Sequence, residues 1–181
     1  MEKRNLTLLT DLYELTMMNG YYLKGKTDEI AVFDVFFRRK ELITYSIAAG
    51  LEQAVDYILG LSFGEEEIAY LRGHNLFDEG FLGYLKNLRF TGDVYSVPEG
   101  TMVFPGEPIL TVKAPVIEAQ LVETAILNII NHQTLIATKS AKVCNAAKGD
   151  NVMEFGLRRA QGPDAGIYGA RAAIIGGCNS T

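Results

Sequence analysis

A change of pattern at residues 92–115 constrains the fold of this chain more than any other feature. The stretch GDVYSVPEGTMVFPGEPILTVKAP consists of short apolar runs separated by PEG at 98–100 and PG at 105–106. Proline and glycine at such spacings favour tight turns, so the pattern predicts a β-rich meander or a set of hairpins. Because helical patterns flank this stretch on both sides, the chain must combine helices with strands.

The segments before this stretch alternate between helix and strand patterns. Residues 10–24 predict an opening helix, in which Asp11 and Glu14 have the spacing of a capping box. EIAVFDVFFRRK at 29–40 is rich in Val, Ile and Phe and predicts a long strand. The remaining predicted elements are a short strand over 45–49 and helices over 51–60, 64–73 and 78–87.

The segments after residue 115 predict two helices and then a strand–loop–helix unit. The helices run from Val116 to about Ile130 and from Thr134 to Ala147, and NVMEFG at 151–156 predicts a brief strand. The final YGARAAIIGG has the small, apolar make-up of a tightly packed helix. This order predicts an α/β fold, although a complete parallel sheet or barrel would need several more strand–helix units.

Charge and hydropathy exclude several classes of protein. Seventeen Lys and Arg against 22 Asp and Glu give a formal net charge of −5, which argues against a protein wrapped on a nucleic-acid backbone. No stretch approaches the roughly 18 consecutive apolar residues of a membrane span, and we recognise no export signal. With only two cysteines in 181 residues, we expect a cytoplasmic protein with no nucleic-acid or membrane partner.

The histidines and cysteines suggest neither a nucleophilic triad nor a zinc site. His74 lies in a polar turn and is expected to be solvated, whereas His132 follows an apolar helical run and is expected to be an interior histidine. Neither has metal-ligating neighbours at the right spacing. Cys144, on an Ala-rich helical face, is expected to pack, and Cys178 either packs or borders a pocket.

The densest group of candidate binding residues is EFGLRRAQGPDAG at 154–166. An apolar run leads to Arg158 and Arg159, and a Gly/Pro loop then opens a helix. Arginine offers a planar fork of donors that suits phosphate or carboxylate, and α/β folds bind ligands at this end of a strand. The alternative is a solvated surface pair. The motif at Thr10–Tyr13 is weaker, because an acid at a helix start is usually a cap.

Together, TDLYELTMMNGYY at 10–22 and EFGLRRAQGPDAG at 154–166 resemble the nicotinate phosphoribosyltransferases, as do ETAILNIINHQTLIATKSAKV at 123–143 and GGCNST at 176–181. The resemblance implies an α+β N-terminal domain over 1–115, which includes the β-rich insert 92–115. It implies that residues 116–181 form the helices and first strands of an incomplete, irregular α/β barrel, with 152–156 as an early barrel strand.

The implied reaction forms nicotinate mononucleotide and pyrophosphate from nicotinate and phosphoribosyl pyrophosphate, with Mg²⁺ and ATP as cofactors, and feeds NAD synthesis. By resemblance, Phe155 matches the ring that stacks on the pyridine base. Tyr13 matches the aromatic residue that covers the opposite face from the neighbouring subunit of a dimer, and Asp11 belongs to the same intersubunit contribution. A flat pyridine ring is well held between two aromatic faces.

The resemblance also assigns the polar side of the site. Arg158 and Arg159 match the arginines that hold phosphate or the carboxylate of the base, and the division of those two roles stays open. Asn179 and Ser180 match the next strand-end loop, which borders the base. Because the pyridine nitrogen is itself the nucleophile, the reaction needs no protein general base.

The family's chains are much longer than 181 residues. The histidine that ATP phosphorylates and the later glycine-rich loop for the 5′-phosphate are missing, and neither His74 nor His132 has the right context, so we assign no catalytic residue. We therefore expect the N-terminal portion of a transferase, with little or no turnover alone. We also expect it to associate with itself or with a complementary C-terminal chain.

Three other functions stay open. The first is a non-catalytic, dimerising or regulatory remnant of the same fold. The second is a carrier domain, because the 92–115 stretch resembles hairpins that present a modified lysine; Lys113, however, lies in a strand-like run and not at a turn. The third is a transferase that uses nicotinamide or quinolinate in place of nicotinate. The motif RRAQGPD favours nicotinate among these three substrates.

Overall fold

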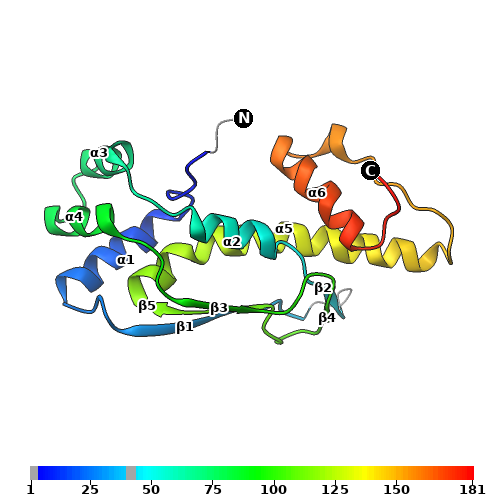
Figure 1. The fold of residues 1–181 in the computed structure, drawn as a ribbon, viewed down its shortest axis with the longest axis horizontal. Helices are drawn as coiled ribbons and strands as arrows, with labels where there is room; N and C mark the ends of the chain where they lie inside the picture. The colour runs from blue at the N-terminus through cyan, green and yellow to red at the C-terminus, as the bar shows by residue number, and fades with distance from the viewer. Residues whose placement is uncertain (1–3, 40–43) are drawn as a thin grey trace. The chain divides into compact units, whose positions relative to one another are not determined.

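The computed structural model describes residues 4–39 and 44–181, which form a mixed helix and strand structure (Figure 1). The predicted α/β class is therefore confirmed. The chain divides into two compact units. The first holds the described residues up to Phe33 together with Val55–Tyr95 and Thr111–Ile126, and the second holds the described residues of the rest. The predicted division into 1–115 and 116–181 stays a prediction.

Three helices of the first unit start as their sequences predict. Helix α1 (Leu12–Leu23) follows Asp11, whose backbone N–H donates to Glu14 Oε2 at 3.2 Å. Helix α3 (Glu65–Gly73) begins with three glutamates, which favour the positive end of a helix dipole. Asp78 caps α4 (Glu79–Asn87) by accepting the N–H of Gly80 at 2.8 Å. Local chemistry thus fixes these helix starts.

Aromatic and aliphatic side chains form the core of the first unit. The ring of Tyr22 on α1 lies 5.9 Å from that of Phe81 and 5.6 Å from that of Tyr84, both on α4. Met18 and Phe81 are fully buried. These contacts hold α1 against α4.

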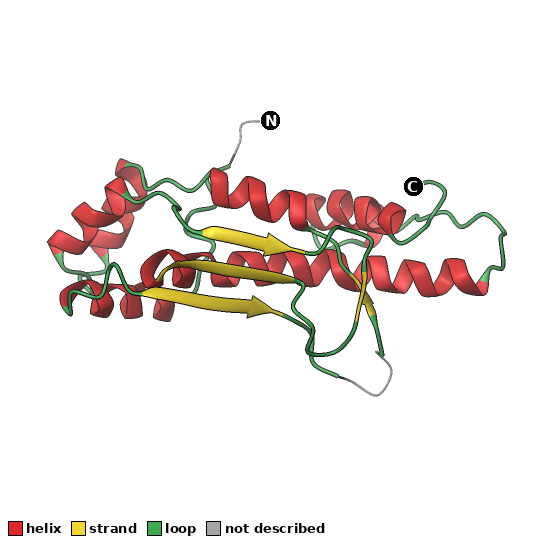
Figure 2. Cartoon of the chain, turned by 60° about the horizontal axis from the view of Figure 1, so that its bottom comes forward, coloured by secondary structure: helices red, strands yellow, loops and turns green. Residues whose placement is uncertain are grey.

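A three-stranded sheet has the order β1-β5-β3 (Figure 2). Its strands are β1 (Ile30–Val35), β3 (Asp93–Ser96) and β5 (Leu110–Pro115). In the central strand, Leu110, Val112 and Ala114 are buried, so burial alternates as a pleated strand requires. Lys113 is an exposed residue within this strand and does not lie at a turn.

The second unit contains a small antiparallel pair of strands and two packed helical segments. Strand β2 (Ser46–Ile47) pairs with β4 (Met102–Val103), and Ser46 is opposite Val103. The end of helix α6 (Pro163–Ile175) lies close to α5 (Val116–Ala146): a Cβ added at Gly176, directly after α6, would lie 2.4 Å from the carbonyl oxygen of Ala137. The small residues of YGARAAIIGG permit this approach, as expected. Helix α2 (Leu51–Leu59) begins in the second unit and ends in the first.

Three details of the predicted secondary structure are wrong. The two helices expected after residue 115 are one helix, α5, because no Gly or Pro interrupts residues 116–146. The strand expected over 29–40 is confined to β1, and residue 40 lies outside the described residues. The strand expected over 151–156 is reduced to one parallel bridge between Met153 and Ser180. A strand needs a paired neighbour along its length, and here the described chain offers only residues 179–180.

Candidate functional site

The loop that carries the paired arginines lies between the Met153–Ser180 bridge and helix α6. Arg158 and Arg159 lie in a short 3₁₀-helix, Leu157–Arg159, and not at the end of a strand as expected. Gly162 then takes a φ of 93°, in the left-handed region that glycine tolerates, and Pro163 occupies the first turn of α6. The sequence GPDAG therefore acts as a turn followed by a helix start.

The segment before Phe155 is held beside Asn179 and Ser180. The backbone N–H of Asn179 donates to the carbonyl of Val152 at 2.8 Å, and the N–H of Glu154 donates to the carbonyl of Ser180 at 2.9 Å. The side-chain oxygen of Asn179 accepts the N–H of Val152 at 2.9 Å. Phe155 itself is not part of a core, since the residue is 59 % exposed. These bonds bring three of the predicted base-binding residues into one neighbourhood.

A cavity of about 270 Å³ lies under this loop, between α5 and α6. Of the predicted site residues, Arg159 lines it, whereas Phe155, Arg158, Asn179 and Ser180 do not. Its other lining residues come from α5, the loop and α6: His132, Ile136, Glu154, Gly156, Ala160, Gln161, Ala165, Gly166, Gly169 and Ala170. Arg159, His132 and Glu154 are among its polar lining residues, but most of the lining surface is apolar.

His132 is the residue of this cavity that sequence reasoning missed. It is half-buried, and its Nε2 lies 3.3 Å from the carbonyl oxygen of Ala165 on α6. The expected interior histidine with a hydrogen-bond partner is therefore only partly correct, because the ring also faces a cavity. The available signal was its place on the helix that precedes the arginine loop. His74, by contrast, is exposed as expected and its ring contacts Tyr70.

Asp11 and Tyr13 lie in the first compact unit, whereas the other predicted site residues lie in the second. Asp11 Oδ2 accepts a long hydrogen bond of 3.4 Å from the hydroxyl of Thr124. Tyr13 is 53 % exposed, and the nearby carboxylate of Glu123 is the largest cause that raises the pKa of its hydroxyl. Both side chains are open to solvent, so both are available to a ligand.

The residues around Asp11 and Tyr13 include a buried carboxylate, that of Glu14. Glu14 is fully buried and accepts hydrogen bonds from the hydroxyls of Thr10 and Thr124, the latter at 2.9 Å. Desolvation by burial, and next the charge of Glu14, raise the pKa of Glu123. Glu14 therefore holds the start of α1 against Thr124 on α5.

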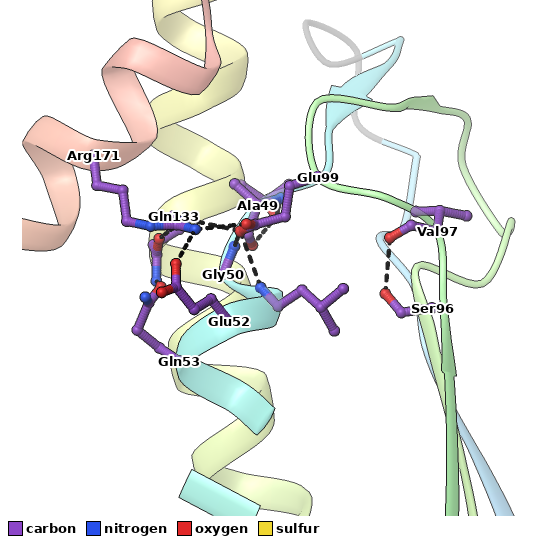
Figure 3. Close-up of polar contacts among 11 residues, drawn as sticks. Ala49, Gly50, Glu52, Gln53, Ser96, Val97, Glu99, Gln133 and Arg171 are labelled. Carbon is purple, nitrogen blue, oxygen red and sulfur yellow. Dashed lines mark hydrogen bonds and ion pairs between the residues drawn. The ribbon is translucent and has the colours of Figure 1, made fainter. Parts of the chain in front are cut away.

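A polar network centred on Arg171 fixes α6 within the second unit (Figure 3). Its guanidinium donates to both carboxylate oxygens of Glu99, at 2.8 and 2.6 Å, and to Glu52 at 2.6 Å. Glu99 Oε1 also accepts the backbone N–H groups of Gly50 and Leu51, at 2.6 and 3.1 Å. The network ties α6, which follows the arginine loop, to the start of α2 and to the turn after β3.

Two further observations concern partners. Over residues 4–39 and 44–181, no group of three or more His, Cys, Asp and Glu side chains is placed to hold a metal ion. Within the same residues, none of the helices has the length and apolar character that crossing a membrane requires.

Comparisons with known sequences point to one family. Residues 8–131 match the model of the nicotinate phosphoribosyltransferase (NAPRTase) N-terminal domain. The chain is 46 % identical over 178 residues to nicotinate phosphoribosyltransferase of Bacillus subtilis (strain 168), a match that covers 98 % of this chain and 36 % of that protein. It is 45 % identical over 175 residues to nicotinate phosphoribosyltransferase pncB2 of Mycobacterium tuberculosis (strain H37Rv), covering 96 % of this chain and 38 % of that protein.

A solved structure extends the likeness to three dimensions. The crystal structure of human nicotinic acid phosphoribosyltransferase superimposes with a TM-score of 0.87 at 34 % identity, and the match covers 95 % of this chain and 36 % of the human chain. The chain thus spans little more than a third of the length of the relatives it matches.

Proposed function

The chain belongs to the nicotinate phosphoribosyltransferase family, and from this membership we propose that it provides the pyridine-binding part of a nicotinate phosphoribosyltransferase. The substrates are then nicotinate and phosphoribosyl pyrophosphate, and the products are nicotinate mononucleotide and pyrophosphate. One observation carries the proposal: the exposed residue Phe155 directly follows the segment that pairs with Asn179–Ser180 and directly precedes the turn that carries the two arginines.

The arrangement suits the chemistry of that reaction. The pyridine nitrogen attacks the anomeric carbon of the ribose, a C–N bond forms, and the C–O bond to pyrophosphate breaks through a cationic, oxocarbenium-like transition state. Arg158 and Arg159 supply fixed positive charge for the carboxylate of the base or for phosphate. Phe155 supplies an aromatic face for the ring. We assign no proton transfer to the protein, because the nucleophile carries a free electron pair.

Mg²⁺ and ATP stay proposals that rest on family resemblance. The part of the chain that the structure describes brings together no set of side chains able to hold a metal ion, so we derive no step through one. Because the relatives are nearly three times as long as the matched region, we propose that turnover needs residues besides these 181. An assay of pyrophosphate release by the purified chain tests this: robust release would contradict it.

Nicotinate binding by the chain tests the proposed site directly. Replacing Arg159 or Arg158 with alanine removes a charged donor, so we expect the Kd for nicotinate, measured by calorimetry, to rise about 10- to 100-fold for the arginine that holds the carboxylate. Nicotinamide, which lacks the carboxylate, should bind the variants and the wild type alike.

Arg89→Ala is the matched control, because Arg89 is an exposed arginine of the first unit that donates only to its neighbour's carbonyl at Leu88 among the contacts described. It should leave nicotinate affinity unchanged. If neither arginine of the turn changes that affinity while wild-type chain binds nicotinate, the arginines do not hold the base.

A further inference from the structure

The two cysteines of the chain meet in the second unit. Cys144, near the end of α5, and Cys178, just after α6, place their sulfur atoms 3.9 Å apart, and both are free thiols. Gly177, which precedes Cys178, also lies beside Cys144: a Cβ added at Gly177 would be in ordinary van der Waals contact, at 3.7 Å, with both Cβ and Sγ of Cys144. Residues 34 positions apart in sequence are therefore held side by side.

This separation is within reach of a covalent bond. A disulfide requires the sulfurs to approach to about 2.05 Å, so the present separation must shorten by about 1.9 Å. Rotation of the cysteine side chains about χ1 can move the sulfurs by that much. The two thiols also differ in access. Cys144 is half-buried, whereas Cys178 is only 8 % exposed. An oxidant therefore meets Cys144 first, and Cys178 is positioned to react with the product.

We propose that Cys144 and Cys178 form an oxidation site that closes reversibly to an intramolecular disulfide in the presence of a peroxide. The Cys144 thiolate attacks one peroxide oxygen, the O–O bond breaks, hydroxide leaves, and a sulfenic acid remains. The sulfur of Cys178 then attacks the Cys144 sulfur, the S–S bond forms, and the sulfenic oxygen leaves as water. Two thiols lose two electrons and two protons, and hydrogen peroxide becomes two molecules of water.

The bond would tie the candidate site to α5. Cys178 immediately precedes Asn179, whose backbone and side chain both bond to Val152. Oxidation would thus fix the segment that carries Asn179 and Ser180 to the end of α5. The proposal itself rests on the geometry of the thiols and holds whether or not the chain binds nicotinate.

Mass spectrometry of the folded 181-residue chain tests the proposal. After treatment with hydrogen peroxide at low protein concentration, we expect the intact mass to fall by two hydrogens and neither cysteine to react with iodoacetamide. A digest should contain a peptide pair joined through Cys144 and Cys178, and dithiothreitol should restore both thiols. In concentrated urea the second step, from the sulfenic acid at Cys144 to the disulfide, should be at least roughly tenfold slower, because the fold no longer holds the two sulfurs together.

Two single variants separate the roles. Cys178→Ser should accumulate a sulfenic acid at Cys144 that dimedone traps, and Cys144→Ser should react with peroxide several-fold more slowly than wild type. The proposal is overturned if oxidised wild type carries independent sulfenic acids or forms only intermolecular dimers on a non-reducing gel. It is also overturned if the step from sulfenic acid to disulfide is no faster in the folded chain than in urea.

Discussion

At the scale of single residues, the pair Glu99–Arg171 lies at the centre of the polar network in the second unit. The guanidinium binds both oxygens of Glu99, and the side chains are only 21 % and 27 % exposed. The hydrogen bond from Arg171 is the largest cause that lowers the pKa of Glu99. A carboxylate whose pKa is lower in the folded state stabilises the fold while it is ionised.

Glu99→Gln should therefore destabilise the chain in a pH-dependent way. Gln keeps an oxygen for the N–H groups of Gly50 and Leu51 but loses the charge that pairs with Arg171, so we expect a loss of about 1–2 kcal/mol at pH 7. The contribution of Glu99 is present above its unfolded pKa, near 4.5, and is lost as the pH falls through its lower folded pKa. Urea denaturation at several pH values should show the difference from wild type shrinking below about pH 4.5.

Glu79→Gln is the matched control for this prediction. Glu79 forms a salt bridge with Arg72 on the surface, at 2.9 Å, where water screens the charges. The hydrogen bond from Arg72 also lowers the pKa of Glu79, but the pair is exposed, so we expect a smaller loss of stability at pH 7 than for Glu99→Gln. A difference for Glu99→Gln that stays constant from pH 7 to pH 3.5 would show that the charge of Glu99 does not stabilise the fold.

The two thiols give a second pH dependence. Burial is the largest cause that raises the pKa of Cys178 above 9.0; the neighbouring Cys144 and Glu154 raise it further, while a hydrogen bond with Ser140 lowers it. Since the thiolate is the attacking form, closure of the disulfide from oxidised Cys144 should accelerate with pH through and beyond pH 9. This rate is measured at pH 7 to 10 by quenching samples at set times with an alkylating agent and counting the alkylated thiols by mass spectrometry. A rate that levels off below pH 8 would contradict the assignment of Cys178 as the attacking thiol.

At the scale of elements, Gly92 shows how closely the strand neighbours approach. A Cβ at this position would lie 2.3 Å from the Cβ of Ala114 and 2.5 Å from the carbonyl oxygen of Lys113, both on β5. Gly92→Ala should force these backbones apart and lower the free energy of unfolding by about 1–3 kcal/mol, measured by urea denaturation.

Gly83→Ala in α4 is the control for this substitution. A Cβ at Gly83 would meet nothing within 4 Å, and alanine favours a helix over glycine. We therefore expect Gly83→Ala to leave stability unchanged or to raise it by about 0.5–1 kcal/mol. Equal losses for both variants would contradict the close approach at Gly92.

The elements also show what the sequence can and cannot predict. The starts of α3 and α4 agree with the helices expected over 64–73 and 78–87, because glutamates follow Gly64 and Asp78 caps α4. Helix α6 begins before the expected YGARAAIIGG, since Gly162 and Pro163 already form its start. The strand expected over 151–156 is reduced to one bridge, because strands depend on neighbours that local sequence does not specify. Helix α5 continued where two helices were expected, since nothing in its sequence breaks it.

The residues of the candidate site were likewise predictable only in part. Motif resemblance pointed to Phe155 and the paired arginines, and the structure holds them in one loop region. It gave no sign of Arg171 and Glu99, which are 72 positions apart and pair only through the tertiary fold. The contact between the His132 ring and the Ala165 carbonyl could not be predicted from the sequence either, because it depends on how α6 packs against α5.

At the scale of the whole molecule, the proposed site needs Tyr13 and Phe155 to come from two copies of the chain. In a symmetric dimer each site would then combine Tyr13 of one copy with Phe155 of the other. Tyr13→Ala and Phe155→Ala should each weaken nicotinate binding. A heterodimer of these two variants contains one site with both residues intact and one with both missing.

Mixing the variants therefore tests the composite site. After equal amounts of Tyr13→Ala and Phe155→Ala chains exchange subunits, half of the dimers are heterodimers, so we expect about a quarter of the wild-type number of binding sites to return. Calorimetry gives that number, and light scattering checks that a dimer forms. Tyr70→Ala, which removes another exposed tyrosine of the first unit, should bind nicotinate as wild type does. If the mixture binds no better than its two components, the aromatic rings do not meet across two chains.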